Sequence, residues 1–242
     1  MELRNILERS GVNFKNNKID IPERFNRIKL DIGLSHNAPH SNLWLDVEDD
    51  LLVFGFEPNP KNIYQLYNIS YNSPYKLKQS YIKNNMYIIP IALDNVEKPT
   101  IMKLYSTKND TGCSSLHMPT QHLQDTVDDI FDVPVFPLKD FFDLLPVDRI
   151  KYVEYIKIDA QGSDLNIIKS LGSEYLKNNI IYITAEPETD QYNTFSNSVD
   201  NMKKYMNDND FLYVKNENTF DPTFINNKYI NLKDNIFIYQ IG

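Results

Sequence analysis

The chain has 242 residues, of which 41% are hydrophobic, and this apolar content is enough to fill the core of one large α/β domain. A formal net charge of -8 and a pI near 5.0 argue against nucleic acid or an anionic membrane as a partner, because both attract basic proteins. One cysteine excludes an internal disulfide framework, the charged start MELRNILERS is not a signal peptide, and no apolar run approaches membrane-spanning length, so a cytoplasmic location is expected.

Residues 1–27 are interpreted as a lead-in to one domain that spans residues 28–242. Within the lead-in, residues 2–9 are predicted to form a short helix, and residues 11–22 a polar segment that packs against the domain or covers its site. Neither an internal repeat nor a linker composition divides the chain further.

Two strands that end in acidic residues follow this lead-in. Residues 28–33, IKLDIG, are predicted to be the first core strand, which breaks at Asp31 and Gly33 into the loop LSHNAPHSN. Residues 51–57, LLVFGFE, are predicted to be the second strand, and they end in Glu57. Glu57 follows Asp31 by 26 positions, close to the spacing at which a carboxylate binds ribose hydroxyls in nucleotide-binding βαβ units. The pair therefore indicates a nucleotide site.

The middle of the chain alternates short apolar and polar segments. Residues 61–68 are predicted to form a helix, and residues 86–93, MYIIPIAL, a third strand that ends at Asp94 and is started or bent by Pro90. Short extended pieces are predicted around a Thr-Gly-Cys turn, at residues 101–105, 114–118 and 133–138, followed by a helical turn at residues 140–145. We interpret the extended pieces as a small flap over the site.

Residues 151–188 contain the most informative pattern of the chain. Residues 152–158 are predicted to be a buried strand that stops at Asp159, a residue that strands disfavour. Gln161 and Gly162 are predicted to form the turn that follows. Ser163 is predicted to be the N-cap of the next helix, and Gly172 its end. The chain thus passes from a strand through an acidic end into a helix.

This helix leads to a second buried strand at residues 179–185, which ends in Glu186 before Pro187. Because a helical crossover makes the two strands parallel, Asp159 and Glu186 are expected at the same edge of the sheet, where open parallel sheets bind ligands. Further elements are predicted as a helix at residues 198–207, a strand at residues 211–215 and a final strand at residues 235–240.

Over residues 28–188 the chain resembles the FkbM family of S-adenosyl-L-methionine-dependent methyltransferases. The motifs that carry this resemblance are DIG, FGFEPNP, IPIALD and YIKIDAQGSDLNIIKSLG. TFINNKYI, at residues 223–230, is similar to the family's closing segment. The resemblance implies a Rossmann-like class I methyltransferase fold: seven mostly parallel strands, helices on both faces, and an antiparallel C-terminal hairpin. It also implies O-methylation of a hydroxyl on a sugar, glycan or small natural product, with S-adenosylmethionine as cofactor.

The resemblance also assigns roles to individual residues. Asp31 and Gly33 would form the turn under the methionine portion, Glu57 would hold the ribose hydroxyls, and Asp159 would face the transferring methyl. The implied cofactor-binding residues are Asp31, Gly33, Ser35, Asn37, Ser41, Glu57, Pro58, Asn59, Ala92, Leu93 and Asp94. The implied catalytic residues are Asp159, Glu186 and Lys157.

Asp159 is the first candidate for the base or acceptor-orienting group, and Glu186 is the second, although an acid before Pro187 is also an ordinary strand end. Lys157 is two residues before Asp159 and therefore lies on the same strand face, where it either orients the acceptor or neutralises the carboxylates. A satisfied ion pair would give the same pattern.

One segment departs from the family pattern. The family loop places a second glycine a few residues after Gly33, whereas this chain has LSHNAP at residues 34–39. The backbone is therefore expected to take another route around the methionine portion of the cofactor.

No metal site is expected from the sequence. His36 and His40 are four residues apart, but Pro39 between them opposes the helix that would bring both to one ion. His117 and His122 lack a third ligand nearby, and Cys113 is interpreted as a small buried thiol.

Three other functions remain open at this point. A catalytically degenerate binding module is suggested by the altered loop after Gly33. A nicotinamide-dependent oxidoreductase would need a GxGxxG turn, which the chain lacks. A nucleic-acid 2′-O-methyltransferase would use a lysine, an aspartate and a glutamate near the methyl, but the acidic charge opposes it.

Overall fold

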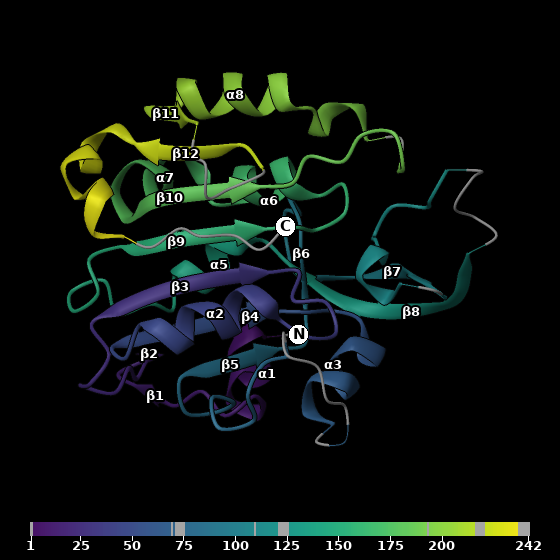
Figure 1. Ribbon diagram of the computed structural model, residues 1–242, viewed down its shortest axis with the longest axis horizontal. Helices are drawn as coiled ribbons and strands as arrows, with labels where there is room; N and C mark the ends of the chain where they lie inside the picture. The colour runs from purple at the N-terminus through teal and green to yellow at the C-terminus, as the bar shows by residue number, and fades with distance from the viewer. Residues whose placement is uncertain are drawn as a thin grey trace.

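The apolar runs of the sequence pair into one large sheet in the computed structural model, which describes residues 2–68, 70, 76–108, 110–120, 126–192, 194–215 and 221–236. The strands of this sheet are β3 (Arg27–Ile32), β4 (Leu51–Phe56), β5 (Met86–Ile89), β9 (Val153–Ile158), β10 (Ile180–Ala185), β11 (Phe211–Val214) and β12 (Thr223–Asn226). They lie in the order β11-β12-β10-β9-β3-β4-β5, and the pairs from β10 to β5 are parallel (Figure 1). β12 runs antiparallel to both β10 and β11. The predicted mostly parallel sheet of seven strands is therefore confirmed.

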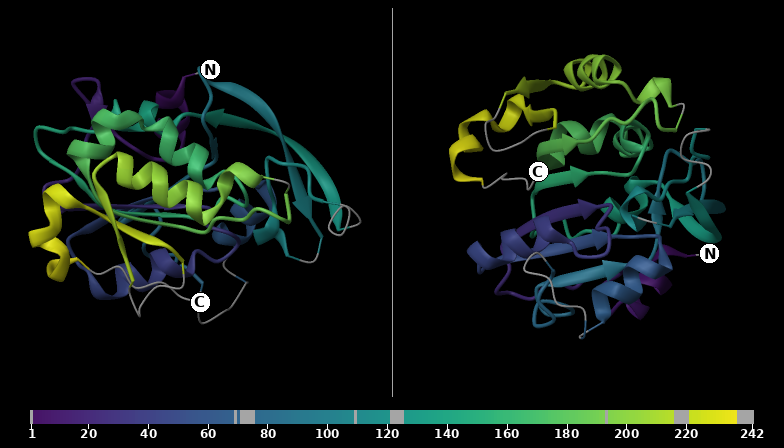
Figure 2. Two further views of the ribbon diagram at one scale, coloured as in Figure 1. Left: turned by 90° about the horizontal axis from the view of Figure 1, so that it is seen from above. Right: turned by 45° about the vertical axis from the view of Figure 1, so that its right-hand side comes forward.

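Helices cover both faces of this sheet because successive strand side chains point to opposite sides. In β4, Leu52, Phe54 and Phe56 belong to one buried cluster, which receives α1 (Leu3–Arg9), α5 (Leu138–Phe142), α6 (Asp164–Ser170), α7 (Gly172–Asn179) and α8 (Val199–Asp208). Leu51 and Val53 belong to a second cluster with α2 (Pro39–Val47), α3 (Pro60–Tyr67) and the 3₁₀ segment η3 (Asn227–Asn235). Figure 2 shows α7 and α8 on one side of the sheet and α2 on the other. Each fully buried Phe contributes about 1.5–3 kcal/mol to holding these layers together.

Most predicted boundaries lie within one residue of the observed ones. This holds for α1, β3, β4, α3, β9, β10, α8 and β11. Gly172 ends α6 as predicted, with φ of +74°, but a second helix, α7, begins at once and was not predicted. The long apolar or amphipathic runs were thus the reliable signals.

The prediction of a loop after Gly33 is wrong from Pro39 onward, where α2 begins. Pro39 occupies the first helical turn, a position where its missing N–H removes no hydrogen bond. Trp44 and Leu45 are buried on this helix, and the Trp44 ring lies 5.3 Å from the ring of Tyr155, centroid to centroid. The helix was not predicted because its first four residues, PHSN, are polar or helix-breaking and give no apolar pattern.

The third predicted strand is divided at Pro90. Its first part is β5, at the edge of the large sheet, and its second part is β6 (Ala92–Leu93), which pairs with β8 (Val127–Phe136) in a separate sheet. β7 (Thr100–Thr107) pairs antiparallel with β8 and completes this three-stranded sheet, beside the carboxyl edge of the large one (Figure 1). Pro90 has no N–H to continue the ladder, so the chain changes sheet there. The predicted piece at residues 101–105 lies in β7, and the piece at 133–138 lies in β8 only as far as Phe136. The helical turn predicted at residues 140–145 is α5, which begins earlier, at Leu138, and ends at Phe142. Residues 114–118 contribute only a bridge between Ser115 and Tyr105.

The ends of the chain add smaller elements. The polar lead-in contains a hairpin of β1 (Phe14–Lys15) and β2 (Lys18–Ile19), joined by two asparagines with positive φ. The final strand predicted at residues 235–240 lies outside the described residues beyond residue 236, and Asn235 ends η3. None of the described helices combines the length and the apolar character that a bilayer crossing needs.

Candidate active site

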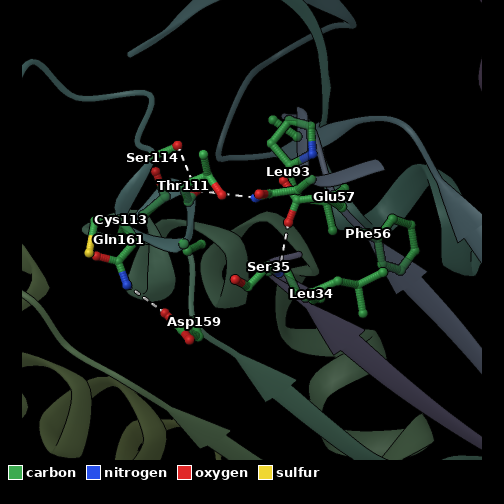
Figure 3. A pocket seen from close by; sticks show the side chains of 18 of the residues that line it. Leu34, Ser35, Phe56, Glu57, Leu93, Thr111, Cys113, Ser114, Asp159 and Gln161 are labelled. Atoms are coloured by element: carbon green, nitrogen blue, oxygen red, sulfur yellow. Dashed lines mark hydrogen bonds between the residues drawn. The ribbon is translucent and has the colours of Figure 1, made fainter. Parts of the chain in front are cut away.

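A cavity of about 340 Å³ opens beyond the carboxyl ends of β3, β4 and β9 (Figure 3). Gly33 after β3, Glu57 after β4 and Asp159 after β9 all line it. Its size falls within the range of small-molecule sites, about 300–1,000 Å³, and its position is where parallel sheets bind ligands. The acidic strand ends found in the sequence therefore meet at one cavity.

Most of the sequence-derived candidates line this cavity directly. They are Gly33, Ser35, Asn37, Glu57, Pro58, Ala92, Leu93, Lys157, Asp159 and Glu186. The remaining candidates, Asp31, Ser41, Asn59 and Asp94, are buried behind its wall. Asp31 accepts a hydrogen bond of 2.5 Å from the Ser41 hydroxyl, and Asp94 accepts one of 3.0 Å from Ser163. These buried residues support the lining and do not face the cavity.

Gly33 joins the ends of β3 and β9. Its φ is +82°, and a Cβ atom placed on it would lie 1.8 Å from the carbonyl oxygen of Asp159. Only glycine permits both this backbone conformation and this contact. The turn thus fixes Asp159 against the start of the loop that follows β3.

That loop makes its turns without the second glycine. Ser35 and Ala38 adopt left-handed conformations, with φ of 56° and 48°. Such a conformation costs a residue with a side chain roughly 1–2 kcal/mol. In return, the Ser35 N–H reaches the Glu57 carboxylate at 2.9 Å. The loop therefore turns without a second glycine, at the cost of backbone strain at Ser35 and Ala38.

Glu57 is buried at the end of β4, with one oxygen held by each neighbouring loop. Oε2 accepts from the Ser35 N–H (Figure 3), and Oε1 accepts from the Asn59 N–H at 2.8 Å. Burial raises the pKa of Glu57 to about 7, against the opposing effect of the Asn59 and Ser35 N–H groups. Each carboxylate oxygen keeps a lone pair, so Glu57 can still accept hydrogen bonds from hydroxyl groups of a ligand.

Lys157 is a buried ammonium group between three oxygen atoms. Its Nζ lies 3.1 Å from Asp159 Oδ2, 3.2 Å from the Gly33 carbonyl oxygen and 3.9 Å from Asp31 Oδ1. Burial works to lower the pKa of Lys157, but the charges of Asp159 and Asp31 outweigh it and hold that pKa above its ordinary value. Lys157 therefore stays protonated, and the chemistry open to it is neutralising and orienting the carboxylates.

Glu186 is half-buried after β10 and also lines the cavity. Burial, together with the nearby charges of Asp159 and Asp221, raises the pKa of Glu186 to about 8. At neutral pH this side chain is therefore mostly a neutral acid, whereas Asp159 accepts from Lys157 and from Gln161 Nε2, the latter at 2.7 Å.

The flap contributes the opposite wall through the 3₁₀ turn η1 (Thr111–Cys113). Asn62 Nδ2 donates to the Thr111 carbonyl at 3.1 Å, and Asn59 Nδ2 donates to Ser114 Oγ at 2.9 Å. The sequence analysis predicted a turn here but assigned none of its residues to the site. The residue that could have indicated a fixed turn is Asp110, whose Oδ1 accepts from the Gly112 N–H at 2.9 Å and closes the turn. Burial raises the pKa of Cys113 to about 11, which agrees with an unreactive thiol.

Two residues of the loop after β9 make contacts that the sequence analysis did not predict. Ser163 stands at the N-cap of α6 as predicted, but its hydroxyl donates to Asp94 and does not cap the helix. Gln161, predicted only as a turn residue, lines the cavity and contacts Asp159 (Figure 3). No group of three or more His, Cys, Asp or Glu in the described part of the chain is arranged to hold a metal ion, and His122 lies outside that part.

The fold and the cavity define an α/β domain with a candidate small-molecule site at the carboxyl edge of its sheet. Residues 48–213 match the family described as "Methyltransferase FkbM domain". The chain belongs to this FkbM methyltransferase family. A solved structure described as "Structure of an antibiotic related Methyltransferase" is similar to it with a TM-score of 0.35 and 11% identity, over 87% of this chain and 96% of that chain. No curated protein matches the chain.

Proposed function

We propose that the protein is an S-adenosylmethionine-dependent O-methyltransferase that acts on a hydroxyl group of a sugar, a glycan or a small natural product. The observation that carries this proposal is the buried Glu57 carboxylate at the end of β4, which faces a cavity that Asp159 also lines. Membership of a methyltransferase family supports the reaction type. The antiparallel β12, paired with β11 at one edge of the sheet, supports a Rossmann-like class I arrangement with a closing hairpin.

The residues present fit this cofactor chemically. Glu57 offers carboxylate oxygens to the two ribose hydroxyls, and the apolar side chains of Ile91, Ala92 and Leu93 offer a surface for adenine. Glu57 and Asp159 suit a positively charged ligand. The Gly33 turn and Ser35, beside them, would hold the methionine portion.

When bound, the cofactor supplies a methyl group on a sulfonium leaving group. The chain must then align an acceptor oxygen with this methyl, and alignment supplies up to roughly 7–11 kcal/mol of the barrier reduction. Asp159 accepts the proton that the acceptor hydroxyl loses, which contributes about 10²- to 10⁴-fold. Lys157 holds the Asp159 carboxylate in place through Oδ2. Glu186, with its pKa near 8, is a hydrogen-bond donor to the acceptor at neutral pH.

Calorimetry tests this proposal with three probes: S-adenosylmethionine, its demethylated product S-adenosylhomocysteine, and NAD. The expected result is micromolar binding of S-adenosylhomocysteine and none of NAD. Binding of NAD alone would instead support an oxidoreductase. Binding of none of the three would support a non-catalytic module. A screen of sugars for release of S-adenosylhomocysteine then identifies the acceptor.

A further inference from the structure

Gln161 connects the Asp159 carboxylate with the flap on the opposite wall of the cavity. Its Nε2 donates to Asp159 Oδ1 at 2.7 Å, and its Oε1 accepts from the Tyr192 hydroxyl at 2.9 Å. The same hydroxyl lies 2.7 Å from the carbonyl oxygen of Cys113, in η1. In addition, the backbone carbonyl of Gln161 accepts a hydrogen bond of 2.6 Å from the Ser115 hydroxyl. Figure 3 shows Gln161 between Asp159 and the turn that carries Cys113.

The chemistry of these groups fixes the direction of the contacts. An ionised carboxylate only accepts hydrogen bonds, so Gln161 must present its amide N–H to Asp159 and its carbonyl oxygen to Tyr192. Tyr192 must then donate. Burial raises the pKa of Tyr192 above its ordinary value, so the hydroxyl keeps its proton, which it shares between Gln161 and Cys113. Asp159 is thus the acceptor at one end of this chain of contacts, and the Cys113 carbonyl is the acceptor at the other.

The backbone of Gln161 is strained in a way that glycine would avoid. Its φ is 49°, in the left-handed region, and Gly162 follows with φ of +101°. A residue with a side chain is kept at this position although glycine adopts the conformation freely. Strain of this kind at a cavity indicates that the side chain has a task there.

We propose that Gln161 is a positioning residue for Asp159, and that Tyr192 makes this positioning depend on the seating of η1. When η1 is in the position seen here, with the Cys113 carbonyl accepting from Tyr192, the Tyr192 hydroxyl fixes the orientation of the Gln161 amide. The amide then donates to Asp159 Oδ1, while Lys157 contacts Asp159 Oδ2. With η1 displaced, Tyr192 loses the Cys113 carbonyl, and the orientation of the Gln161 amide is no longer fixed. The proposal rests on the proposed function, in which Asp159 accepts the proton.

Cys113 is a direct reporter of η1, because it is the one cysteine of the chain. The rate at which iodoacetamide alkylates it measures how often η1 opens. Tyr192→Phe removes the hydroxyl that contacts the Cys113 carbonyl, and Gln161→Glu turns the donor that faces Asp159 into a second carboxylate, whose repulsion displaces the side chain from Tyr192. Each variant should therefore raise this rate by about tenfold. Tyr213→Phe removes a hydroxyl from an exposed tyrosine on β11 and serves as the matched control, with no change expected.

A paired substitution separates positioning from simple packing. Gln161→Glu places a carboxylate against Asp159, whereas adding Asp159→Asn restores one donor and one acceptor with the direction reversed. The double variant should therefore return to the parental alkylation rate, and Asp159→Asn alone should stay within about twofold of it. A residue with a merely structural role would not be rescued by a change at Asp159.

Gln161→Gly provides a second readout. The glycine relieves the left-handed strain, so the variant should keep the parental Tm while Cys113 becomes about tenfold more reactive. Parental alkylation rates in Tyr192→Phe and Gln161→Glu, or a double variant without rescue, would overturn the proposal. Binding of S-adenosylhomocysteine is measured separately by calorimetry, so a failure of the proposed function is recognised independently of the Cys113 result.

Discussion

Gly33 and Asp159 are in backbone contact so close that a Cβ atom on Gly33 would lie 1.8 Å from the Asp159 carbonyl oxygen. Gly33→Ala should therefore destabilise the fold by about 2–5 kcal/mol, the sum of left-handed strain and overpacking. Gly172→Ala is the matched control. Its φ is also positive, at +74°, but nothing lies within 4 Å of the added methyl, so only the strain of about 1–2 kcal/mol is expected. Urea unfolding of both variants measures the difference, and equal losses would show that the contact is unimportant.

The left-handed conformation of Ser35 predicts an unusual response to glycine. Ser35→Gly should change the free energy of unfolding by less than about 1 kcal/mol, because relief of strain offsets the greater freedom of glycine in the unfolded chain. The same change in an ordinary helical position, Ser173→Gly in α7, should cost about 0.5–1 kcal/mol. Thermal unfolding compares the two. A larger loss for Ser35→Gly than for Ser173→Gly would mean that the serine side chain, and not the backbone, decides this loop.

The acidic strand ends could be predicted from the sequence because they follow from a local pattern. A buried apolar run that stops at an acid and a turn places that acid at the edge of a parallel sheet, and Glu57, Asp159 and Glu186 all line the cavity there. Asp31 obeyed the same pattern, yet its side chain turns behind the wall to Ser41. Asp31 lies inside β3, beside Lys157 of β9, and its partner Ser41 belongs to α2, the helix that was missed.

The opposite wall of the cavity could not be predicted by the same route. Tyr192 and Gln161 meet across 31 positions of sequence, and Tyr192 and Cys113 across 79. These contacts depend on how the sheet of β6, β7 and β8 folds back onto the loop after β9, and no spacing in the sequence records that arrangement. The flap was therefore predicted as a covering element, whereas its indirect link to Asp159, through Tyr192 and Gln161, was not.

The raised pKa values of Glu57 and Glu186 predict how stability depends on pH. A carboxyl whose folded pKa lies above its unfolded value binds its proton more tightly in the native state, so the free energy of unfolding falls as pH rises between the two values. The folded pKa values are about 7 for Glu57 and about 8 for Glu186, each above the ordinary glutamate value of 4.5. Stability should therefore fall between about pH 5 and pH 8.

Glu186→Gln tests this sign. The variant lacks one titrating group, so its Tm should fall less steeply across the upper half of this interval, between about pH 6.5 and pH 8. Glu97→Gln, at an exposed glutamate, should follow the parental curve. A Glu186→Gln curve parallel to the parental one would show that Glu186 is ionised throughout.

Glu57 should control affinity for the cofactor more than any other side chain of the cavity. Glu57→Gln turns one acceptor oxygen into a donor that faces the Ser35 or Asn59 N–H, and it removes the charge opposite the ribose. S-adenosylhomocysteine should bind about 10- to 100-fold more weakly, which corresponds to the loss of one hydrogen bond to a charged group. Calorimetry of Glu57→Gln beside Glu97→Gln measures this effect, with circular dichroism to establish that both are folded. Unchanged affinity in Glu57→Gln would remove Glu57 from the cofactor site.

Asp159 should matter for turnover and not for cofactor affinity. Asp159→Asn preserves the shape of the side chain and its contact with Gln161, but an amide cannot accept the proton of the acceptor hydroxyl. We expect the rate of S-adenosylhomocysteine release, measured with the best acceptor from the sugar screen, to fall by about 10²- to 10⁴-fold, while the Kd for S-adenosylhomocysteine stays within about threefold. Asp148→Asn, at an exposed aspartate, is the control and should turn over normally. Parental turnover in Asp159→Asn would show that Asp159 is not the proton acceptor.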